Sequence, residues 1–139
     1  MLQLVKSRFS IAIHIMTFLA KYPDEWITSG HLAKSVNINA ALIRKELIDL
    51  KTHNLIESKE GKNGGVKLAK SADEILLAEI FKIIKGRNHI LEFSKNEGNS
   101  NCPVGSQIKT KLDELYEDMD AAILKNLAKI TLEEFKERF

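Results

Sequence analysis

The residues best suited to a chemical role are basic side chains in the first half of the chain. Arg44 can donate two parallel hydrogen bonds to the edge of a guanine base, and Lys45 beside it can bind a phosphate. Small side chains just before them would let a helix approach a base closely or touch a thymine methyl group. The pattern predicts contact with duplex DNA. The candidate recognition residues are Asn39, Ala40, Ala41, Arg44 and Lys45.

A second candidate is the run GKNGG at residues 61–65, which lies between two short apolar segments. Glycine tolerates positive φ, so the run predicts a β-hairpin with a thin basic tip that can enter a groove of DNA. A nucleotide-binding loop would need the P-loop spacing and a Lys-Ser/Thr pair after the last glycine, and both are missing. The candidate residues of this wing and its flanks are Lys6, Arg8, Lys59, Lys62, Asn63, Gly64 and Lys67.

Each of these motifs also has an ordinary structural explanation. Arg44 and Lys45 can form a solvated helix face that pairs with Glu46 or Asp49, and the glycine run can be a simple tight hairpin. Their combination with two short helices is typical of a winged helix-turn-helix that binds DNA. The alternative from another class is a winged helix that binds an acidic protein partner and has no operator.

Other chemistry is sparse. The single cysteine, Cys102, excludes an intrachain disulfide and is typical of a reducing compartment. It lies before a long helix, whose N-terminus favours a thiolate, so it is a candidate redox residue; the alternative is a thiol without a role. Four scattered histidines lack metal-ligand spacing, and no nucleophile–base arrangement is present. We expect no metal site, no catalytic residues and no enzyme activity.

The periodicity of the chain predicts the elements that position these residues. Helices are expected at 4–20, 29–35, 40–52, 71–85 and 106–129, strands at 55–59 and 66–69, and a last helix capped by Thr131 with Glu134. The first helix is apolar on nearly every side, which predicts that it is mostly buried. The third should bury Leu42 with Ile43, Leu47 and Leu50. The predicted fold is mainly α with a small β-hairpin: a winged helix-turn-helix plus a long C-terminal dimerisation helix.

An apolar stripe runs along the expected helix at 106–129. A stripe on a helix this long is typical of packing against a partner helix, and it predicts a homodimer. The expected interface residues are Ile108, Leu112, Leu115, Met119, Ile123 and Leu127. We therefore divide the chain into a DNA-binding domain (1–86), a sensor-type loop (87–105) and a dimerisation segment (106–139).

Charge and hydropathy agree with this division. The 139 residues carry a net charge of +2, are 44% hydrophobic and 29% charged. The excess of basic residues lies in the first half and the excess of acidic residues in the second. No apolar run approaches the ~20 residues that span a bilayer. His14 and Thr17 interrupt the apolar N-terminal stretch, and no small-residue cleavage site follows before Lys21, so it is interpreted as a core helix rather than a signal peptide. We expect a cytoplasmic protein without a membrane partner.

Residues 32–86 resemble the bacterial winged-helix regulators that include the iron–sulfur cluster regulator, the nitric-oxide-sensing repressor and the cysteine-metabolism repressor. The most specific part is Gly61 with Gly64 and Gly65, followed by Leu68 and Ala69. The resemblance extends from the first helix to the last. It implies a homodimeric, DNA-binding transcriptional regulator, a repressor on a palindromic operator.

The chain departs from this family where a cofactor would bind. Cluster-binding members carry three closely spaced cysteines before the long helix, whereas this chain has only Cys102 there, and Gly105 where the iron–sulfur cluster regulator has a histidine ligand. Since a [2Fe–2S] cluster needs four ligands, no iron–sulfur cluster is expected. Glu60 also stands in the wing where a basic residue is common. The effector, a small molecule or a redox signal, stays open.

Overall fold

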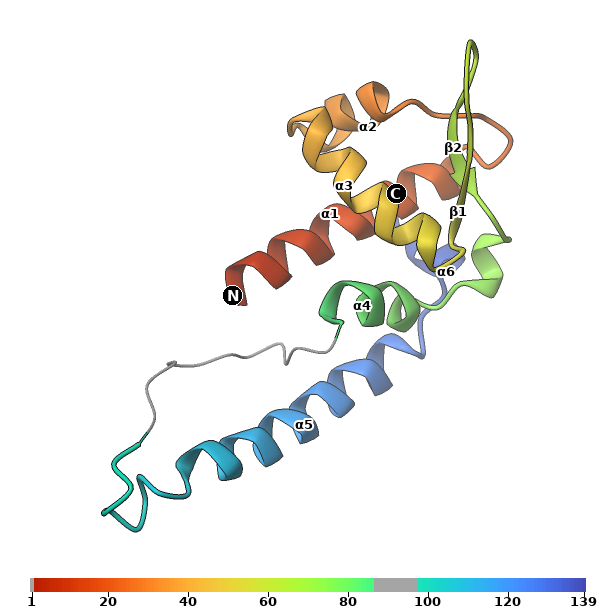
Figure 1. Ribbon diagram of the computed structural model, residues 1–139. Helices are drawn as coiled ribbons and strands as arrows, with labels where there is room; N and C mark the ends of the chain where they lie inside the picture. The colour runs from red at the N-terminus through yellow and green to blue at the C-terminus, as the bar shows by residue number, and fades with distance from the viewer. Residues whose placement is uncertain (1, 87–97) are drawn as a thin grey trace.

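The computed structural model describes residues 2–86 and 98–139, with side chains from Arg8 onward within these ranges (Figure 1). The expected class, mainly helical with one antiparallel hairpin, is confirmed. The elements are α1 (Leu2–Lys21), α2 (Ser29–Val36), α3 (Ala40–Thr52), β1 (Ile56–Lys59), β2 (Gly65–Leu68), the 3-10 helix η1 (Ala72–Glu74), α4 (Leu77–Lys85), α5 (Ile108–Leu127) and α6 (Leu132–Lys136).

The core is built around α1. Its side chains Ile15, Met16 and Leu19 are fully buried and contact apolar residues of the helices and strands that surround it. Full burial of a side chain of this size contributes about 1.5–3 kcal/mol. The core thus fixes α2 and α3, the two helices that follow, against one rigid support.

Helix α1 is less buried than its composition predicted. His14 is exposed, and its Nε2 lies 2.9 Å from Ser35 Oγ on α2. Ile13 and Phe18 are half-buried, so one side of α1 remains open. Within the part of the chain that the structure describes, no helix, α1 included, is long and apolar enough to cross a membrane.

Side-chain caps define the helix-turn-helix. Thr28 Oγ1 accepts a hydrogen bond from His31 N at the start of α2, and Asn39 Oδ1 accepts one from Ala41 N at the start of α3. Such caps are each worth about 1 kcal/mol. Between the helices, Asn37 adopts a left-handed conformation (φ 63°), which asparagine tolerates better than most residues. The turn between α2 and α3 therefore lies where the sequence predicted it.

The hairpin of β1 and β2 is anchored to the body by a third segment. Ile27 exchanges two backbone hydrogen bonds with Val66, of 2.9 and 2.8 Å. This contact requires Gly65, because a Cβ there would lie 2.5 Å from the carbonyl oxygen of Ile27. The base of the hairpin is thus fixed, while its tip projects from the molecule (Figure 1).

The expected continuous helix at 71–85 is wrong in its first half. η1 ends at Glu74, the chain is extended at Ile75 and Leu76, and α4 begins at Leu77. The reason is a tertiary contact: Leu132 N donates to Ile75 O (2.7 Å), and Leu77 N donates to Ile130 O (3.0 Å). Leu132 is fully buried, so the C-terminal segment is part of the body and not only an arm.

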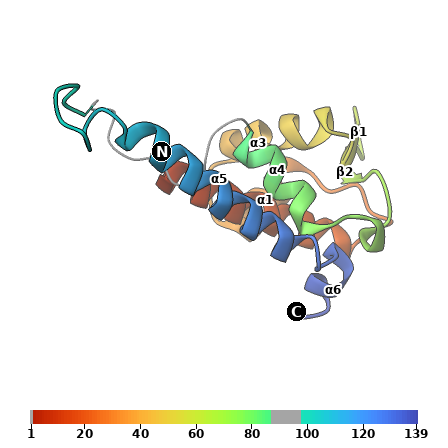
Figure 2. The same ribbon diagram turned by 90° about the horizontal axis from the view of Figure 1, so that it is seen from below.

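Helix α5 packs on α4 and then extends beyond the body at its N-terminal end (Figures 1 and 2). Lys85 Nζ and Asp120 Oδ2 lie 3.6 Å apart at the contact, where Tyr116 is also buried. The part of α5 that precedes this contact has little of the body beside it.

The apolar stripe of α5 is not one straight face. Its last members follow at steps of four residues, and each such step overshoots a full turn by about 40°. The stripe therefore winds from an outer face onto the body. Ile108, Leu115 and Met119 are exposed, Leu112 and Ile123 are half-buried, and Leu127 packs against the core.

Candidate nucleic-acid interface

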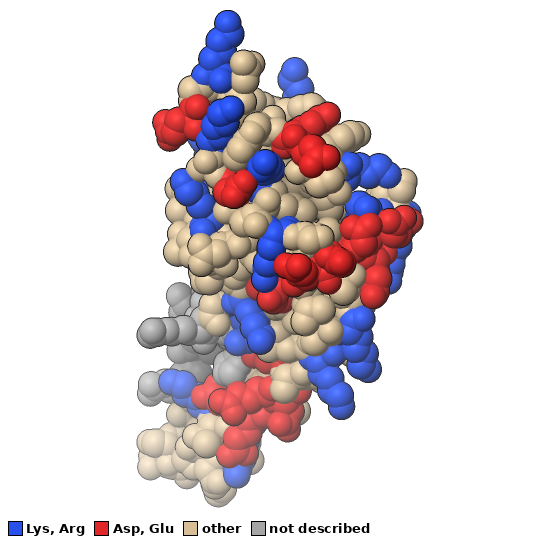
Figure 3. All heavy atoms as spheres, turned by 90° about the vertical axis from the view of Figure 1, so that its right-hand side faces the viewer, with Lys and Arg blue, Asp and Glu red and all other residues tan. Residues whose placement is uncertain are grey.

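The N-terminal end of α3 and the tip of the hairpin lie at the same end of the molecule (Figure 1). On the face shown in Figure 3, basic side chains cap the end where the hairpin projects, and a group of acidic side chains lies at the level of α5. The outermost side chains at the hairpin end are basic, although acidic side chains also lie lower on this face (Figure 3). A basic tip favours phosphate.

The exposed face of α3 carries the expected cations. Ala41, Arg44 and Lys45 are exposed, and Ala40 is half-buried. In the described part of the chain, neither Arg44 nor Lys45 makes a side-chain hydrogen bond or ion pair. Both are thus available for an external anion, and the alternative that they pair with Glu46 or Asp49 does not hold in this structure.

Those two carboxylates bind Arg8 instead. Arg8 Nε lies 2.9 Å from Glu46 Oε1, and its Nη2 lies 3.3 Å from Glu46 Oε2 and 2.8 Å from Asp49 Oδ2. The hydrogen bond to Glu46, with the charges of both carboxylates, raises the pKa of the Arg8 guanidinium further above its usual value. The Glu46 side chain is only 5% exposed, so this contact joins α1 to the buried side of α3.

Arg8 therefore corrects two expectations. We expected it to flank the wing and meet phosphate, whereas its guanidinium is engaged by α3. Glu46 was expected on the helix surface and is buried. The periodicity of the sequence treats an acidic residue as solvated, and only the approach of α1 shows that a guanidinium neutralises it. The side chain of Lys6, the other expected flanking residue, lies outside the described side chains.

Two apolar residues of α3 were not recognised in the sequence as surface residues. Leu42, expected in the core, is 52% exposed, and Ile48 is 65% exposed. Ala41, Lys45 and Ile48 follow at spacings of four and three, which aligns them on one side of a helix. An exposed aliphatic side chain on that face can contact a thymine methyl group. The sequence offers no clear signal for Ile48, because an aliphatic residue on a helix is ordinarily assigned to the core.

The wing tip presents Lys62 and Asn63. Both are exposed, and Asn63 has a left-handed backbone (φ 66°). Gly64 makes the turn tight: its N–H donates to Gly61 O (3.0 Å), and a Cβ on it would lie 2.1 Å from Lys59 O. Gly64 shapes the tip, and Lys62 supplies its charge.

Two wing lysines have an unexpected partner. The Nζ of Lys67 lies 4.5 Å from the ring centroid of Trp26, and that of Lys59 lies 5.9 Å from it. Lys67 Nζ is also 3.8 Å from Glu57 Oε1. Cation–π contact is worth about 0.5–1 kcal/mol at an exposed site. Trp26 thus holds the ammonium groups of both strands on one side of the hairpin.

Cys102 lies before α5 and is exposed. The backbone N–H groups of Gly105 and then Val104 point to its sulfur and lower the pKa of the thiol. The rest of the expected sensor loop, 87–97, is outside the described residues. In the remainder, no three His, Cys, Asp or Glu side chains gather as metal ligands would.

Comparison with known proteins gives a consistent match. Residues 5–138 fit the model of the Rrf2 family, described as iron-dependent transcriptional regulators. The chain is 30% identical over 131 residues to YwnA of Bacillus subtilis (strain 168), named as an HTH-type transcriptional regulator; the match covers 94% of this chain and 96% of that protein. The resemblance found in the sequence is confirmed.

Solved structures show the same fold. A transcriptional regulator from Lactobacillus plantarum superimposes with a TM-score of 0.77 at 22% identity, covering 94% of this chain and 87% of that one. CymR (YrzC), the global cysteine regulator of B. subtilis, superimposes with a TM-score of 0.70 at 20% identity, covering 95% of each chain. At these identities the likeness concerns the fold alone, and it confirms the winged helix-turn-helix.

Proposed function

Because this chain belongs to the Rrf2 family of transcriptional regulators, we propose that it binds a palindromic operator as a homodimer and represses transcription. The observation that carries the proposal is the exposed face of α3, whose Arg44 and Lys45 lack any partner in the described part of the chain. An unpaired guanidinium on a helix beside a basic wing is suited to a base edge framed by phosphates.

In this proposal the parts of the interface have separate tasks. Arg44 reads a guanine, and Ile48 or Ala41 touches thymine methyl groups. Lys62 at the wing tip binds phosphate and contributes affinity without sequence preference. Asn39 acts mainly through the structure, since its side chain caps α3. Arg8 acts by positioning α3 through Glu46 and Asp49.

The proposed dimer forms through the outer face of α5. Ile108, Leu115 and Met119 are exposed large apolar side chains on a helix that extends past the body. Two such stripes from two copies would cover each other, and the two recognition helices would then lie across a two-fold axis. That symmetry is why the operator should be an inverted repeat. A dimer bound over a promoter represses by excluding the polymerase.

The possible ligand residues of this chain do not fit the iron–sulfur cluster that cluster-binding members of the family hold. The sequence holds one cysteine, and its thiol is exposed on a turn where two backbone N–H groups point to the sulfur. One thiolate per subunit leaves most of the four ligand positions unfilled. We therefore propose that no resident cluster takes part in DNA binding by this protein.

The same donors support a thiol signal. The N–H groups of Gly105 and Val104 stabilise the thiolate of Cys102, and the thiolate is the form that attacks hydrogen peroxide. The S–O bond forms as the O–O bond breaks, which gives a sulfenic acid and releases hydroxide. Cys102 precedes α5, the proposed dimer helix. In this proposal its oxidation changes the spacing of the two DNA-binding heads.

Titration of DNA at several salt concentrations tests the function. For a DNA-binding regulator, log K falls linearly with log salt, by about 0.9 for each phosphate contacted. Competition between a specific duplex and a scrambled one separates sequence reading from charge attraction. A flat salt dependence, together with equal affinity for both duplexes, would favour the alternative of a protein-binding winged helix.

A further inference from the structure

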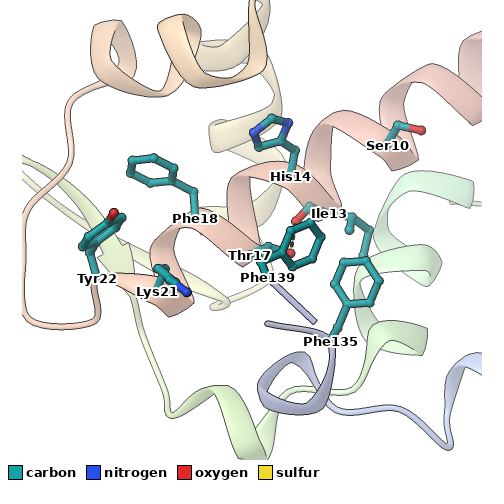
Figure 4. A pocket seen from close by; sticks show the side chains of 9 residues that line it. All are labelled: Ser10, Ile13, His14, Thr17, Phe18, Lys21, Tyr22, Phe135 and Phe139. Atoms are coloured by element: carbon teal, nitrogen blue, oxygen red, sulfur yellow. Dashed lines mark hydrogen bonds between the residues drawn. The ribbon is translucent and has the colours of Figure 1, made fainter. Parts of the chain in front are cut away.

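A cavity of about 460 Å³ lies between α1 and the C-terminal residues (Figure 4). One wall is the open side of α1, and the other is formed by Phe135 on α6 and by Phe139 (Figure 4). A cavity of this size suits a small molecule. Neither the DNA-binding face nor the outer stripe of α5 contributes to its lining.

Aromatic rings make up much of the lining. The ring centroids of Phe18 and Tyr22 are 5.1 Å apart on the α1 side, and those of Phe135 and Phe139 are 5.4 Å apart on the other. Two facing pairs of rings favour a flat apolar body, which can stack or meet them edge to face. The side chain of Phe139 is exposed, so a ligand in the cavity can pack against its ring.

The lining includes one cationic side chain. Lys21 lines the cavity, and none of the lining side chains that the structure describes is a carboxylate. Lys21 forms no ion pair in the described part of the chain. A further cation stands behind the far wall, where the Arg138 guanidinium lies 5.3 Å from the ring of Phe135. Aromatic walls with an unpaired ammonium at the rim complement a small aromatic carboxylate.

The same residues are connected to the helix-turn-helix. His14 Nε2 lies 2.9 Å from Ser35 Oγ on α2, and Phe18 meets the ring of His31, also on α2, at a centroid distance of 5.3 Å. Helix α2 packs directly on α3. A ligand that displaces Phe18 or His14 would therefore act on the support of the recognition helix.

The opposite wall is connected to the segment that follows α5. Phe135 belongs to α6, whose first residue, Leu132, donates its N–H to Ile75 O next to α4. One wall of the cavity is thus connected through α6 to the segment before α4, the helix on which α5 packs.

We propose that this cavity binds a small aromatic carboxylate, with the carboxylate at Lys21 and the ring between Phe18 and Phe139, and that its occupation changes the affinity for the operator. The second half of the proposal rests on the proposed function, whereas the binding itself does not.

The test uses naphthoate as the probe and naphthamide, its uncharged isostere, as the control. Binding is measured by calorimetry on the full-length protein without DNA. Naphthoate is expected to bind more tightly than naphthamide. Lys21→Gln should weaken the binding of naphthoate about two- to fivefold, which is the contribution expected of an exposed charge pair. The binding of naphthamide should not change.

Two further variants locate the site. Phe139→Ala removes an exposed ring and should weaken both probes about two- to tenfold without unfolding the protein. The matched control is Lys129→Gln, an exposed lysine that does not line the cavity, which should change neither affinity. The proposed site is overturned if neither probe binds at millimolar concentration, or if Phe139→Ala binds both probes as the wild type does.

The preference for a carboxylate and the effect of the ligand on operator affinity are tested separately. Equal binding of acid and amide, unaffected by Lys21→Gln, would overturn the assignment to a carboxylate. Operator affinity is then measured with and without saturating naphthoate. An unchanged affinity would overturn the regulatory half while the site stands, and a protein that binds naphthoate but no DNA would refute the proposed function instead.

Discussion

At the scale of single residues, Arg8 is a cation that is neutralised within the protein. Its guanidinium is divided between Glu46, which is nearly fully buried, and Asp49, which is partly exposed. Removing one partner of a buried ion pair leaves an uncompensated charge, which costs more than the pair itself contributes. The contact therefore fixes the orientation of α3 and constrains its residue types.

Arg8→Ala should lower the free energy of unfolding by about 3 kcal/mol, because Glu46 would keep a buried charge without its partner. Urea denaturation measures this change. The control is Lys45→Ala, which removes an unpaired cation from α3, the helix that carries Glu46, and should shift stability by less than about 0.5 kcal/mol. If Arg8→Ala is as stable as the control and instead reduces the salt slope of DNA binding, Arg8 is a phosphate contact.

Arg44 and Lys62 should give opposite patterns in DNA binding. Arg44→Ala is expected to cost about 1–3 kcal/mol on the operator and to relax base preference near one position, because it removes a bidentate contact. Lys62→Ala should weaken binding to all DNA sequences alike and reduce the slope of log K against log salt by about one unit. Affinity titrations on operator and single-base variants measure both. Unchanged base preference in Arg44→Ala would show that another residue reads the operator.

Cys102 should respond to oxidants and pH as a thiolate does. Its pKa is lowered, so the thiolate persists to lower pH than in an unperturbed cysteine, and the midpoint of its alkylation by iodoacetamide should fall below about pH 8.5. Peroxide should weaken operator binding, and a thiol reductant should restore it. Cys102→Ser is the control: if it responds to peroxide like the wild type, the thiol is not the sensor.

At the scale of elements, the sequence predicted those whose evidence is local. The two helices of the helix-turn-helix were predicted from periodicity and the tip of the wing from its glycines, and these elements lie where expected. The errors arose from tertiary contacts. η1 and α4 are separated because the segment around Leu132 pairs with Ile75, and no local pattern encodes that partner.

The residues of the candidate site also fall into two groups: those whose exposure was predicted and those whose contacts or exposure were not. Arg44, Lys45 and Lys62 lie on exposed surfaces as predicted, since an isolated cation on a helix or a glycine-rich tip has no local partner. The neutralisation of Arg8, the stacking of Lys67 on Trp26 and the exposure of Ile48 depend on which elements pack together. Periodicity alone cannot determine such packing, because residues distant in the chain supply the partners.

The dimer interface is a prediction about one element, α5. Leu115→Glu with Met119→Lys should give monomers in sedimentation experiments, because both side chains are on the exposed stripe. Neither is buried in the protomer, so the fold should survive and circular dichroism should be unchanged. Asp118→Lys, an exposed charge change on the same helix, is the control and should stay dimeric. A dimeric double variant would place the interface elsewhere.

At the scale of the whole molecule, the proposed DNA-binding elements and the proposed dimer helix lie at different ends. The basic end carries α3 and the wing, and α5 extends from the opposite side with its acidic face (Figures 1 and 3). The aromatic cavity lies between α1 and the C-terminal residues, and Cys102 lies just before the end of α5 that extends away from the body (Figure 1). Two signals acting there would change the same quantity, the distance between two recognition helices in a dimer.

Selection of duplexes from a random library, followed by salt titration of the enriched duplex, tests the central claim most directly. We predict an inverted repeat whose half-sites lie about 10 base pairs apart or a multiple of that, with affinity that falls linearly with log salt and is weakened by about 1–3 kcal/mol in Arg44→Ala. If no sequence is enriched, or if the enriched duplex binds the Arg44→Ala protein as well as the wild type, the account of α3 as a base-reading helix is contradicted.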